Sequence, residues 1–334
     1  MSPVFRTRLL LAGSLSALAF CATAATSYGP QLQGFSYPYP VHHYRFNSQG
    51  QALDMGYMDV APTVAGNGRT VVLLHGKNFC GATWDYSIKA LSGAGYRVVV
   101  PDQIGFCTSS KPDHYQYSFQ QLAANTHDLL ASLGVSQATL VGHSTGGMLA
   151  ARYALVYPQA TRQLVMVNPI GLEDWKALGV PWRSVDQWYQ RELKLNADGI
   201  RNYEKNTYYV GRWKPEYDRW VDMLAGLNQG PGHLKVAWNS ALIYDMIFTQ
   251  PVYYELPQLK VPTLLMIGDA DTTAIGSDIA PPEVKARVGH YAVLGKQTAQ
   301  RIPGSRLIEF PGKGHAPQME DPAGFNQALV KALD

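Results

Sequence analysis

Short apolar runs alternate with helical segments along most of this 334-residue chain. The runs that predict buried strands occupy residues 70–74, 97–100, 139–141, 164–167, 262–267 and 306–310. The segments that predict helices occupy residues 84–91, 118–133, 145–157 and 322–333. Ser118 is a suitable N-cap for the second helix. Apolar runs separated by helices are typical of a parallel sheet buried on both faces. The pattern therefore predicts an α/β fold, with a mostly parallel central sheet flanked by helices.

The start of the chain follows a different pattern. Residues 26–40 are rich in Tyr, Pro, Gly and Ser, and they predict an extended lead-in. Residues 41–46 and 53–60 then have the character of two strands, joined by the polar segment Asn47-Ser48-Gln49-Gly50. Two such runs with a polar, glycine-containing connection predict a β-hairpin.

The alternation of strands and helices stops between residues 170 and 258. That stretch holds all but one of the chain's seven Trp residues, namely Trp175, Trp182, Trp188, Trp213, Trp220 and Trp238. We predict that it is mostly helical and forms a cap inserted into the sheet domain. The expected organisation is a signal peptide (1–25), a first core segment (26–169), a helical cap (170–258) and a second core segment (259–334).

The first residues have the features of a secretory signal peptide. Arg6 and Arg8 precede an apolar run at 9–20, and Ala22-Thr23-Ala24 offers small residues for cleavage. The run is shorter than the roughly 20 residues that a transmembrane helix needs, although an uncleaved anchor is the alternative. We therefore expect a periplasmic or secreted protein with no stable membrane anchor after cleavage.

Composition and charge narrow the range of partners. The chain is 46% hydrophobic and 16% charged, as in globular proteins, and its formal net charge is +3 with Lys and Arg scattered. A nucleic-acid-binding protein concentrates positive charge on one stripe or tail, so we expect no nucleic-acid partner. The chain also lacks H-E-x-x-H, C-x-x-C and phosphate-loop patterns, so we expect no metal or other cofactor. No pattern indicates an oligomeric state.

The strongest chemical signal is Gly142-His143-Ser144-Thr145-Gly146, a G-x-S-x-G sequence between a predicted strand and a predicted helix. A sharp strand-to-helix turn forces strained backbone angles on its central residue, and small neighbours let the chain approach itself there. The turn presents the serine hydroxyl beside a helix N-terminus, which favours negative charge. We therefore predict that Ser144 is a nucleophile. A capping serine in a glycine-rich turn is the alternative.

A serine needs a base to activate it and a third group to orient that base. In this architecture the acid and then the histidine follow the serine along the chain. Asp271 follows the strand at 262–267 and is placed to hold a histidine, and His315 follows the strand at 306–310 in a glycine-rich loop. Asp269, which directly follows the same strand, is the alternative candidate for the acid that orients the histidine.

Together these motifs resemble those of the α/β-hydrolase superfamily, over nearly all of the chain beyond the signal peptide. The matching segments are Leu74-His75-Gly76, Pro101-Asp102-Gln103-Ile104-Gly105, residues 142–146, residues 268–271, Gly314-His315 and Glu320-Asp321-Pro322. The resemblance implies that Ser144 is the nucleophile, that His315 acts as general base and then acid, and that Asp271 orients it. It also favours Asp271 over Asp269.

The reaction also needs N–H donors for the oxyanion that develops on the substrate. The backbone N–H of Thr145, directly after the nucleophile, is the first donor expected. The resemblance points to the backbone N–H of Lys77, after His75-Gly76, as the second. Asn78 could serve instead, through its backbone or its side chain.

Cys80 and Cys107 are the cysteines that remain once the signal peptide is removed. They lie in loops after the first two parallel strands, which should meet at one edge of the sheet. Disulfides persist in the compartments to which exported proteins are sent. We therefore predict a Cys80–Cys107 disulfide, with two free buried thiols as the alternative.

The predicted function is that of an exported serine hydrolase resembling carboxylic-ester hydrolases. An aromatic cap suggests a small apolar or aromatic acyl substrate, although the same rings could form the cap's own core. Capped family members such as epoxide hydrolases and haloalkane dehalogenases use an aspartate nucleophile, and Ser144 argues against them. Hydrolysis of an ester, lactone or amide is therefore the first candidate reaction, and hydrolysis of a carbon–carbon bond is the second. An acyltransferase and a non-catalytic binding protein are further alternatives.

Overall fold

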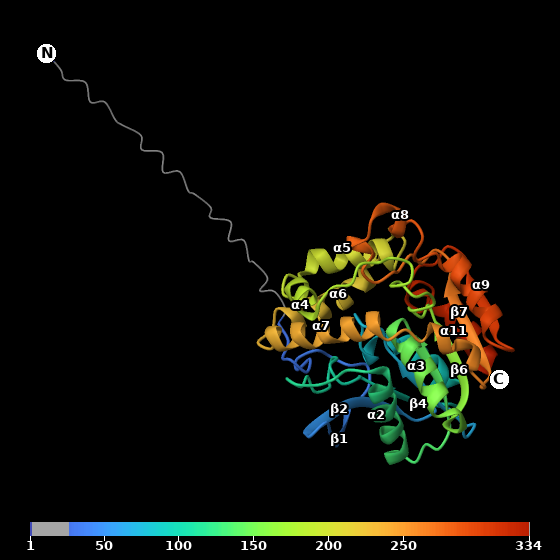
Figure 1. Cartoon of the computed structure of the whole chain (residues 1–334). Helices are drawn as coiled ribbons and strands as arrows, with labels where there is room; N and C mark the ends of the chain where they lie inside the picture. Colours follow the sequence, from blue (N-terminus) through green and yellow to red (C-terminus); the bar gives the residue numbers. More distant parts are fainter. Residues whose placement is uncertain (2–26, 334) are drawn as a thin grey trace.

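The computed structural model describes residue 1 and residues 27–333, and an eight-stranded sheet forms the centre of that part of the chain (Figure 1). The strands lie in the order β1-β2-β4-β3-β5-β6-β7-β8. Their bounds are β1 His42–Ser48, β2 Gln51–Val60, β3 Thr70–Leu74, β4 Arg97–Pro101, β5 Ala138–His143, β6 Thr161–Val167, β7 Thr263–Gly268 and β8 Arg306–Phe310. The predicted signal peptide falls, apart from Met1, outside the described residues and stays a prediction.

The pairing of the strands confirms the mostly parallel sheet. β3 to β8 pair in parallel, whereas β2 pairs antiparallel with both β1 and β4. The hairpin turn is tighter than the sequence indicated, because Ser48 pairs with Gln51. The two turn residues, Gln49 and Gly50, have φ angles of 51° and 73°. A two-residue turn with positive φ at both positions matches the twist of paired strands, which explains the shorter connection.

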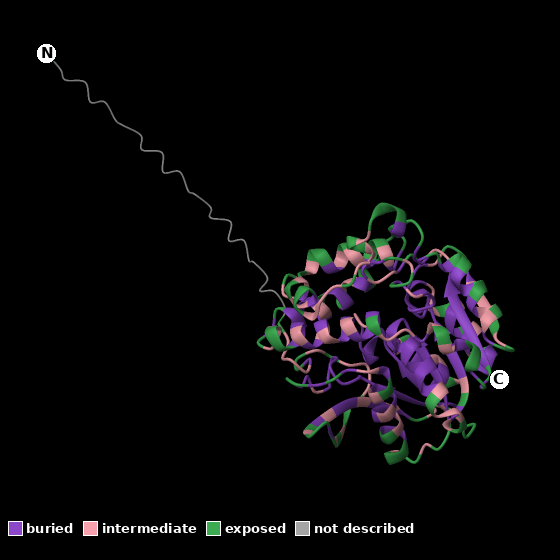
Figure 2. Cartoon of the chain, viewed as in Figure 1, coloured by how far each residue is buried: buried purple, intermediate pink, exposed green. Residues whose placement is uncertain are grey.

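Figure 2 shows that strands in the interior of the molecule are mostly buried. Alternate side chains of the sheet enter two different cores. On β3, Val71 and Leu73 belong to one core, and Val72 and Leu74 belong to the other. The helices that contribute to the first core are α1 Asp85–Gly93 and α11 Pro322–Leu333. Those that contribute to the second are α2 Phe119–Ser132, α3 Thr145–Val156 and α9 Tyr291–Arg301. Both faces of the sheet are therefore covered.

The sequence signals for helix ends are found mainly where they were expected. The hydroxyl of Ser118 accepts the N–H of Gln121 at 3.0 Å and caps α2. Trp84 does not begin α1, because a short 3-10 turn at Gly81–Trp84 precedes the helix. Two further short helices are α8 Pro282–Lys285 and α10 Pro317–Glu320. Among the described residues, no helix combines the length and the apolar character needed to cross a membrane.

Residues 170–258, here called the helical insert, separate β6 from β7 and contain no strand. Their main helices are α4 Val185–Glu192, α5 Ala197–Thr207, α6 Asp218–Asn228 and α7 His233–Thr249. In Figure 1 these helices gather on one side of the molecule, above α3. Trp188 stacks on Tyr244 with ring centroids 4.3 Å apart, and Tyr209 stacks on Tyr217 at 3.8 Å. Part of the aromatic content therefore packs the insert itself.

One carboxyl group is buried in the helical insert without a partner. Glu204, on α5, is 0% exposed, and neither of its side-chain oxygens has a hydrogen-bond partner in the described chain. Burial raises the pKa of Glu204 from its ordinary 4.5 to about 8. The carboxyl is therefore protonated at neutral pH in the folded protein, whereas it is ionised in the unfolded chain.

This difference makes the stability depend on pH. Between pH 4.5 and about 8 the folded state holds a proton that the unfolded chain has released, so stability falls as pH rises across that interval. We expect Glu204→Gln to be close to the native protein in stability at pH 4.5 and to exceed its unfolding free energy at pH 8 by about 4 kcal/mol. Urea unfolding at the two pH values, followed by Trp fluorescence, measures the difference.

Glu216→Gln is the matched control, because the Glu216 side chain lies in the same insert and is 55% exposed. It should give no gain that grows with pH. An equal gain from Glu204→Gln at both pH values would contradict the argument, because it would show that the group does not change its protonation on folding.

Candidate active site

Ser144 occupies the turn between β5 and α3. Its φ of 56° and ψ of −121° are unfavourable for a residue that carries a β-carbon. Gly142 and Gly146 make this turn possible: a β-carbon on Gly142 would collide with the carbonyl of Gly146, and one on Gly146 with the carbonyl of Leu74. The G-x-S-x-G sequence thus sits between a strand and a helix, and Ser144 is 6% exposed.

His315 lies in the loop after β8 and is held by Asp271. The Nδ1 of His315 and the Oδ2 of Asp271 are 2.7 Å apart, and both side chains are 0% exposed. Asp269 is only half-buried, and its Oδ1 accepts the N–H of Gly312 at 2.7 Å. That bond holds the shape of the loop. The structure therefore brings Asp271, and not Asp269, to His315.

Two residues that the sequence did not single out complete the surroundings of Asp271. The Nδ2 of Asn168, directly after β6, donates to Asp271 Oδ2 at 2.9 Å. Thr273 donates to Asp271 Oδ1 through its N–H at 2.8 Å and its hydroxyl at 2.6 Å. With His315 these make four hydrogen bonds to one buried carboxyl group, which offset the cost of its burial. The available signal for Asn168 was its position directly after a buried strand.

The second ring nitrogen of His315 is not engaged. Nε2 is buried and has no hydrogen-bond partner in the described part of the chain. Tyr208 of the helical insert and His143 pack against the ring, with centroid distances of 4.8 Å and 4.9 Å. The Nε2 of His143 lies 2.8 Å from the His315 carbonyl oxygen. Because His143 is the neighbour of Ser144, this contact joins the loop of His315 to the turn of Ser144.

His143 is suited to a structural role in this contact. Burial, together with the neighbouring His315, holds the pKa of His143 well below its ordinary value. The ring is therefore neutral, and its Nε2–H donates to the His315 carbonyl.

Backbone N–H groups lie on both sides of Ser144. Thr145 is the first residue of α3, so its N–H has no acceptor within the helix. Lys77 lies in a turn that is closed by a 3.1 Å hydrogen bond from the Phe79 N–H to the Gly76 carbonyl. A β-carbon on Gly76 would lie 2.9 Å from the Cβ of Ser144, which shows how closely this turn approaches the serine. The turn of Lys77 and the first residue of α3 therefore both lie next to Ser144.

The side chains of Lys77 and Asn78 both contact the helical insert. Asn78 Nδ2 donates one of its two N–H groups to the Tyr208 hydroxyl at 2.8 Å, which ties this side chain to the insert. Lys77 Nζ lies 3.0 Å from Glu192 Oε2 and 3.7 Å from the centroid of the Tyr244 ring. The turn that offers the Lys77 N–H is thus attached to the insert at two points.

Glu192 is a buried carboxylate, 1% exposed, surrounded by charged and polar partners. Arg191 Nη1 lies 2.9 Å from its Oε1, and the hydroxyl of Ser240 donates to its Oε2. Burial alone would raise the pKa of Glu192, but the positive charges of Lys77 and Arg191 outweigh burial and hold the pKa below its ordinary value. Glu192 is therefore ionised, and it pairs with Lys77.

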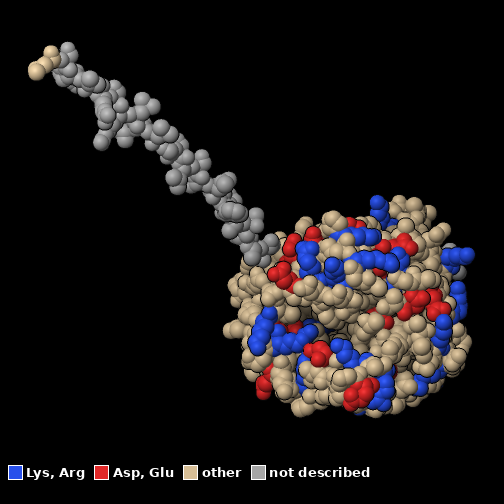
Figure 3. Space-filling view, turned by 90° about the horizontal axis from the view of Figure 1, so that it is seen from above, with Lys and Arg blue, Asp and Glu red and all other residues tan. Residues whose placement is uncertain are grey.

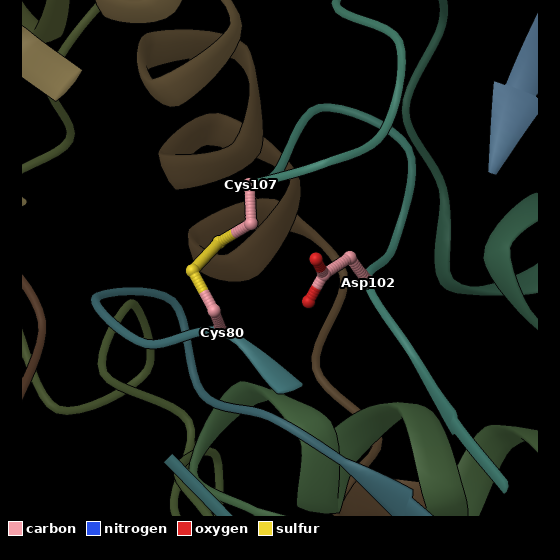
Figure 4. Close-up of side chains that lie close together, drawn as sticks. All are labelled: Cys80, Asp102 and Cys107. Carbon is pink, nitrogen blue, oxygen red and sulfur yellow. A yellow bond between two sulfur atoms is a disulfide. The ribbon is translucent and has the colours of Figure 1, made fainter. Parts of the chain in front are cut away.

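Cys80 and Cys107 form a disulfide, as predicted, with their Cα atoms 5.8 Å apart. Figure 4 shows the disulfide beside the carboxyl group of Asp102. Among the described residues these three are a group whose potential ligand atoms lie close enough for a metal ion. Both sulfurs are bonded to each other, so they offer no thiolates, and we assign the cluster a structural role.

Asp102, which follows β4, fixes the same loop from its other side. Its Oδ1 accepts the N–H of Gly81 at 2.7 Å. Its Oδ2 accepts the N–H of Thr108 at 3.1 Å and the hydroxyl of Tyr37 at 2.6 Å. The loop that carries Lys77 is therefore held by both a covalent bond and a buried hydrogen-bond network.

Figure 3 views the molecule from above, and Lys and Arg side chains are interspersed with Asp and Glu over this face. No broad area of one sign covers it. The expectation that the chain binds no nucleic acid concerns the whole surface and stays a prediction.

The disulfide gives a direct stability prediction. Because it closes a loop with a sequence separation of 27, we expect Cys80→Ser/Cys107→Ser to lower the free energy of unfolding by about 3 kcal/mol. Urea unfolding of the two proteins without reductant measures the loss. As a control, dithiothreitol should destabilise the native protein to the level of the double variant and leave the variant unchanged. Equal stability of the two oxidised proteins would contradict the prediction.

Comparison with known proteins places the chain among hydrolases. A family model described as the alpha/beta hydrolase fold matches residues 69–210. The crystal structure of a probable hydrolytic enzyme from Pseudomonas aeruginosa is 63% identical, covers 93% of this chain and 99% of that chain, and superposes with a TM-score of 0.92.

Two curated relatives extend the similarity. An uncharacterised protein of Mycobacterium tuberculosis is 34% identical over 290 residues, which are 81% of this chain and 77% of that protein. A Synechocystis protein with the provisional name non-heme chloroperoxidase is 28% identical over 291 residues, which are 84% of this chain and 95% of that protein. With the sheet order and the motifs described above, these similarities show that the chain belongs to the α/β-hydrolase superfamily of enzymes.

Proposed function

We propose that this chain is an exported serine hydrolase that cleaves an ester-type bond in a small substrate. Ser144 is the nucleophile, His315 the general base and acid, and Asp271 the group that orients His315. The observation that carries the proposal is the buried 2.7 Å hydrogen bond between Asp271 and His315. It assigns the proton of His315 to Nδ1 and leaves Nε2, which has no other partner in the described chain, as the base beside the turn of Ser144.

The reaction follows from this arrangement. Ser144 Oγ attacks the substrate carbonyl while His315 Nε2 takes the hydroxyl proton. The resulting imidazolium is stabilised by Asp271, and it then donates that proton to the leaving alcohol. Water attacks the acyl-enzyme in the second half, with His315 again accepting and returning a proton. No step requires a cofactor.

The negative charge on the substrate oxygen is stabilised by two backbone N–H groups, those of Thr145 and Lys77. Their rigidity matters because preorganised donors need no rearrangement when the charge develops. The α3 N-terminus adds a favourable electrostatic potential at the same point. Removing one such donor from a comparable site slows the reaction by about 10² to 10³.

The proposed substrate class and the proposed export of the protein rest on separate observations. The helical insert brings aromatic rings to the site, Tyr208 directly against His315, which favours a small substrate with an apolar or aromatic acyl part. We propose that the insert acts as a cap. The basic and apolar residues at 6–20 support export, and the Cys80–Cys107 disulfide is compatible with an oxidising compartment.

The first test is hydrolysis of short and medium p-nitrophenyl esters by the native protein and by Ser144→Ala. We expect the variant to lose at least about 10⁴-fold in kcat, because the nucleophile acts as a unit with His315. A fluorophosphonate probe should label the native protein at Ser144, as shown by peptide mass, and should not label the variant.

The alternatives give different results in the same experiment. Labelling of Ser144 without ester turnover favours a carbon–carbon bond hydrolase or a narrow natural substrate. Turnover in which an added alcohol outcompetes water for the acyl group identifies an acyltransferase. Absence of both labelling and turnover overturns the proposal and favours a binding protein on the same fold.

The choice of acid is tested by a matched pair of variants. Asp271→Asn should lower kcat by about 10⁴, because the amide no longer fixes the tautomer of His315. Asp269→Asn should keep kcat within about threefold, because Asp269 contacts only the loop backbone. Circular dichroism confirms that both variants are folded. Similar losses in the two variants would contradict the assignment of Asp271.

A further inference from the structure

A cavity with a volume of about 240 Å³ lies within the helical insert, beside Asn78. Its walls come from helices α4 to α7 and from the connection between α4 and α5. Ser144, His315 and Asp271 do not line it, so the cavity is a place apart from the proposed reaction centre. None of the described residues in its walls is an Asp or a Glu, whereas two of them are cations.

The two cations have hydrogen-bonding capacity to spare. Lys194 is exposed, and its ammonium group has no hydrogen-bond or ion-pair partner in the described chain. Arg191 uses Nη1 for Glu192 Oε1 at 2.9 Å and for the Tyr244 hydroxyl at 3.2 Å, and its Nε and Nη2 have no partner among the described residues. Neither nitrogen is among the buried unpaired atoms of the described chain, and the Arg191 side chain is 34% exposed. A ligand can therefore reach both nitrogens, which suit the two oxygens of a carboxylate.

Other groups of the wall also favour negative charge. The Tyr244 hydroxyl accepts a hydrogen bond from Arg191, which leaves its own O–H free to donate. Helix α5 begins at this cavity, because its N-cap Asn196 and its first-turn residue Gly199 both line it. Free N–H groups in the first turn of a helix produce a positive potential. Asp198, the acidic residue of the same turn, is exposed and does not line the cavity.

The charges beside the cavity do not cancel. The carboxylate of Glu192 lies between Arg191 and Lys77, with Oε2 3.0 Å from Lys77 Nζ. With Lys194, three positive charges are therefore matched by one negative charge among these four side chains. This excess favours an anionic ligand and disfavours a cationic one. The apolar part of the wall includes Leu195, Ile200 and Leu224.

We propose that this cavity is a binding site for a small carboxylate with an apolar or aromatic body. Arg191 and Lys194 hold the carboxylate, the Tyr244 hydroxyl donates to it, and the apolar wall contacts the body of the ligand. The site is additional to the proposed reaction centre. Its ligand needs no reaction at Ser144.

Benzoate and benzamide test the proposal, because they share one ring and nearly one size but differ in charge. Isothermal titration calorimetry at pH 7 measures the Kd of each for the native protein. We expect benzoate to bind at least about tenfold more tightly, because hydrogen bonds between charged groups are stronger than those of a neutral amide. The preference should shrink in 0.5 M salt, since the two cations are partly exposed.

Variants of the two cations locate the carboxylate. Lys194→Gln should weaken benzoate binding by about three- to fivefold and leave benzamide unchanged, because an exposed charge contributes modestly. Arg191→Gln/Lys194→Gln should abolish the preference. Lys77 still pairs with Glu192 in the double variant, so the fold should persist, and circular dichroism checks it.

Lys205→Gln is the matched control. Lys205 is an exposed lysine on the same helix α5, but it does not line the cavity. Its replacement removes the same charge from the insert and should leave the Kd of benzoate within about twofold. A loss equal to that of Lys194→Gln would show that only the overall charge matters, and it would contradict the site.

The remaining outcomes are equally decisive. Equal affinities for benzoate and benzamide, or no binding of either, would overturn the proposal. A benzoate preference that survives the double variant, or that is lost in Ser144→Ala, would place the carboxylate elsewhere and would also overturn it. Because the experiment measures binding and not turnover, failure of the proposed hydrolase function would leave this test unaffected.

Discussion

The structure depends on keeping one carboxyl group, that of Asp271, inside the protein. An unpaired carboxyl group cannot be buried without a large cost, so the packing of the surrounding segments requires these donors. These donors come from three successive strand ends: Asn168 after β6, Thr273 after β7 and His315 after β8. Parallel strands place such ends at one edge of the sheet, which is why residues more than 100 positions apart in sequence meet there. The same hydrogen bonds therefore determine both the fold of this edge of the sheet and the orientation of His315.

A second buried carboxyl group plays the corresponding role on the other side of β5. Asp102 joins the lead-in, through Tyr37, to the loops of Gly81 and Thr108, and the Cys80–Cys107 disulfide joins the same two loops covalently. Ser144 lies between the region held by Asp271 and the region held by Asp102 and the disulfide. Its strained φ of 56° is held because nearly all of α3 is buried behind it and cannot shift to relax the turn. Strain at the serine is thus maintained by the surrounding packing and not by the turn alone.

The patterns along the sequence predict the features that depend on neighbouring residues. Apolar runs predict the strands because buried parallel strands need such side chains, and the small neighbours of Ser144 predict the sharp turn. The choice between Asp269 and Asp271 is different, because both follow β7 and only the three-dimensional path of the loop decides which one meets His315. Asn168 and Thr273 were missed for the same reason. Their function exists only through their contact with Asp271.

The contacts of Lys77 and Asn78 connect the helical insert to the chemistry. Lys77 is paired with the buried Glu192, and Asn78 with the Tyr208 hydroxyl, while the backbone of the same turn offers the proposed oxyanion donor. Lifting the insert would separate the Glu192 carboxylate from Lys77, while leaving it paired with Arg191, and would take the Tyr208 ring off His315. Because breaking a buried ion pair has a cost, these contacts favour the arrangement in which the insert rests on the turn. The insert therefore covers His315 and adds two contacts to a turn whose loop is already held by the Cys80–Cys107 disulfide and by Asp102, so the proposed oxyanion donor is held from both sides.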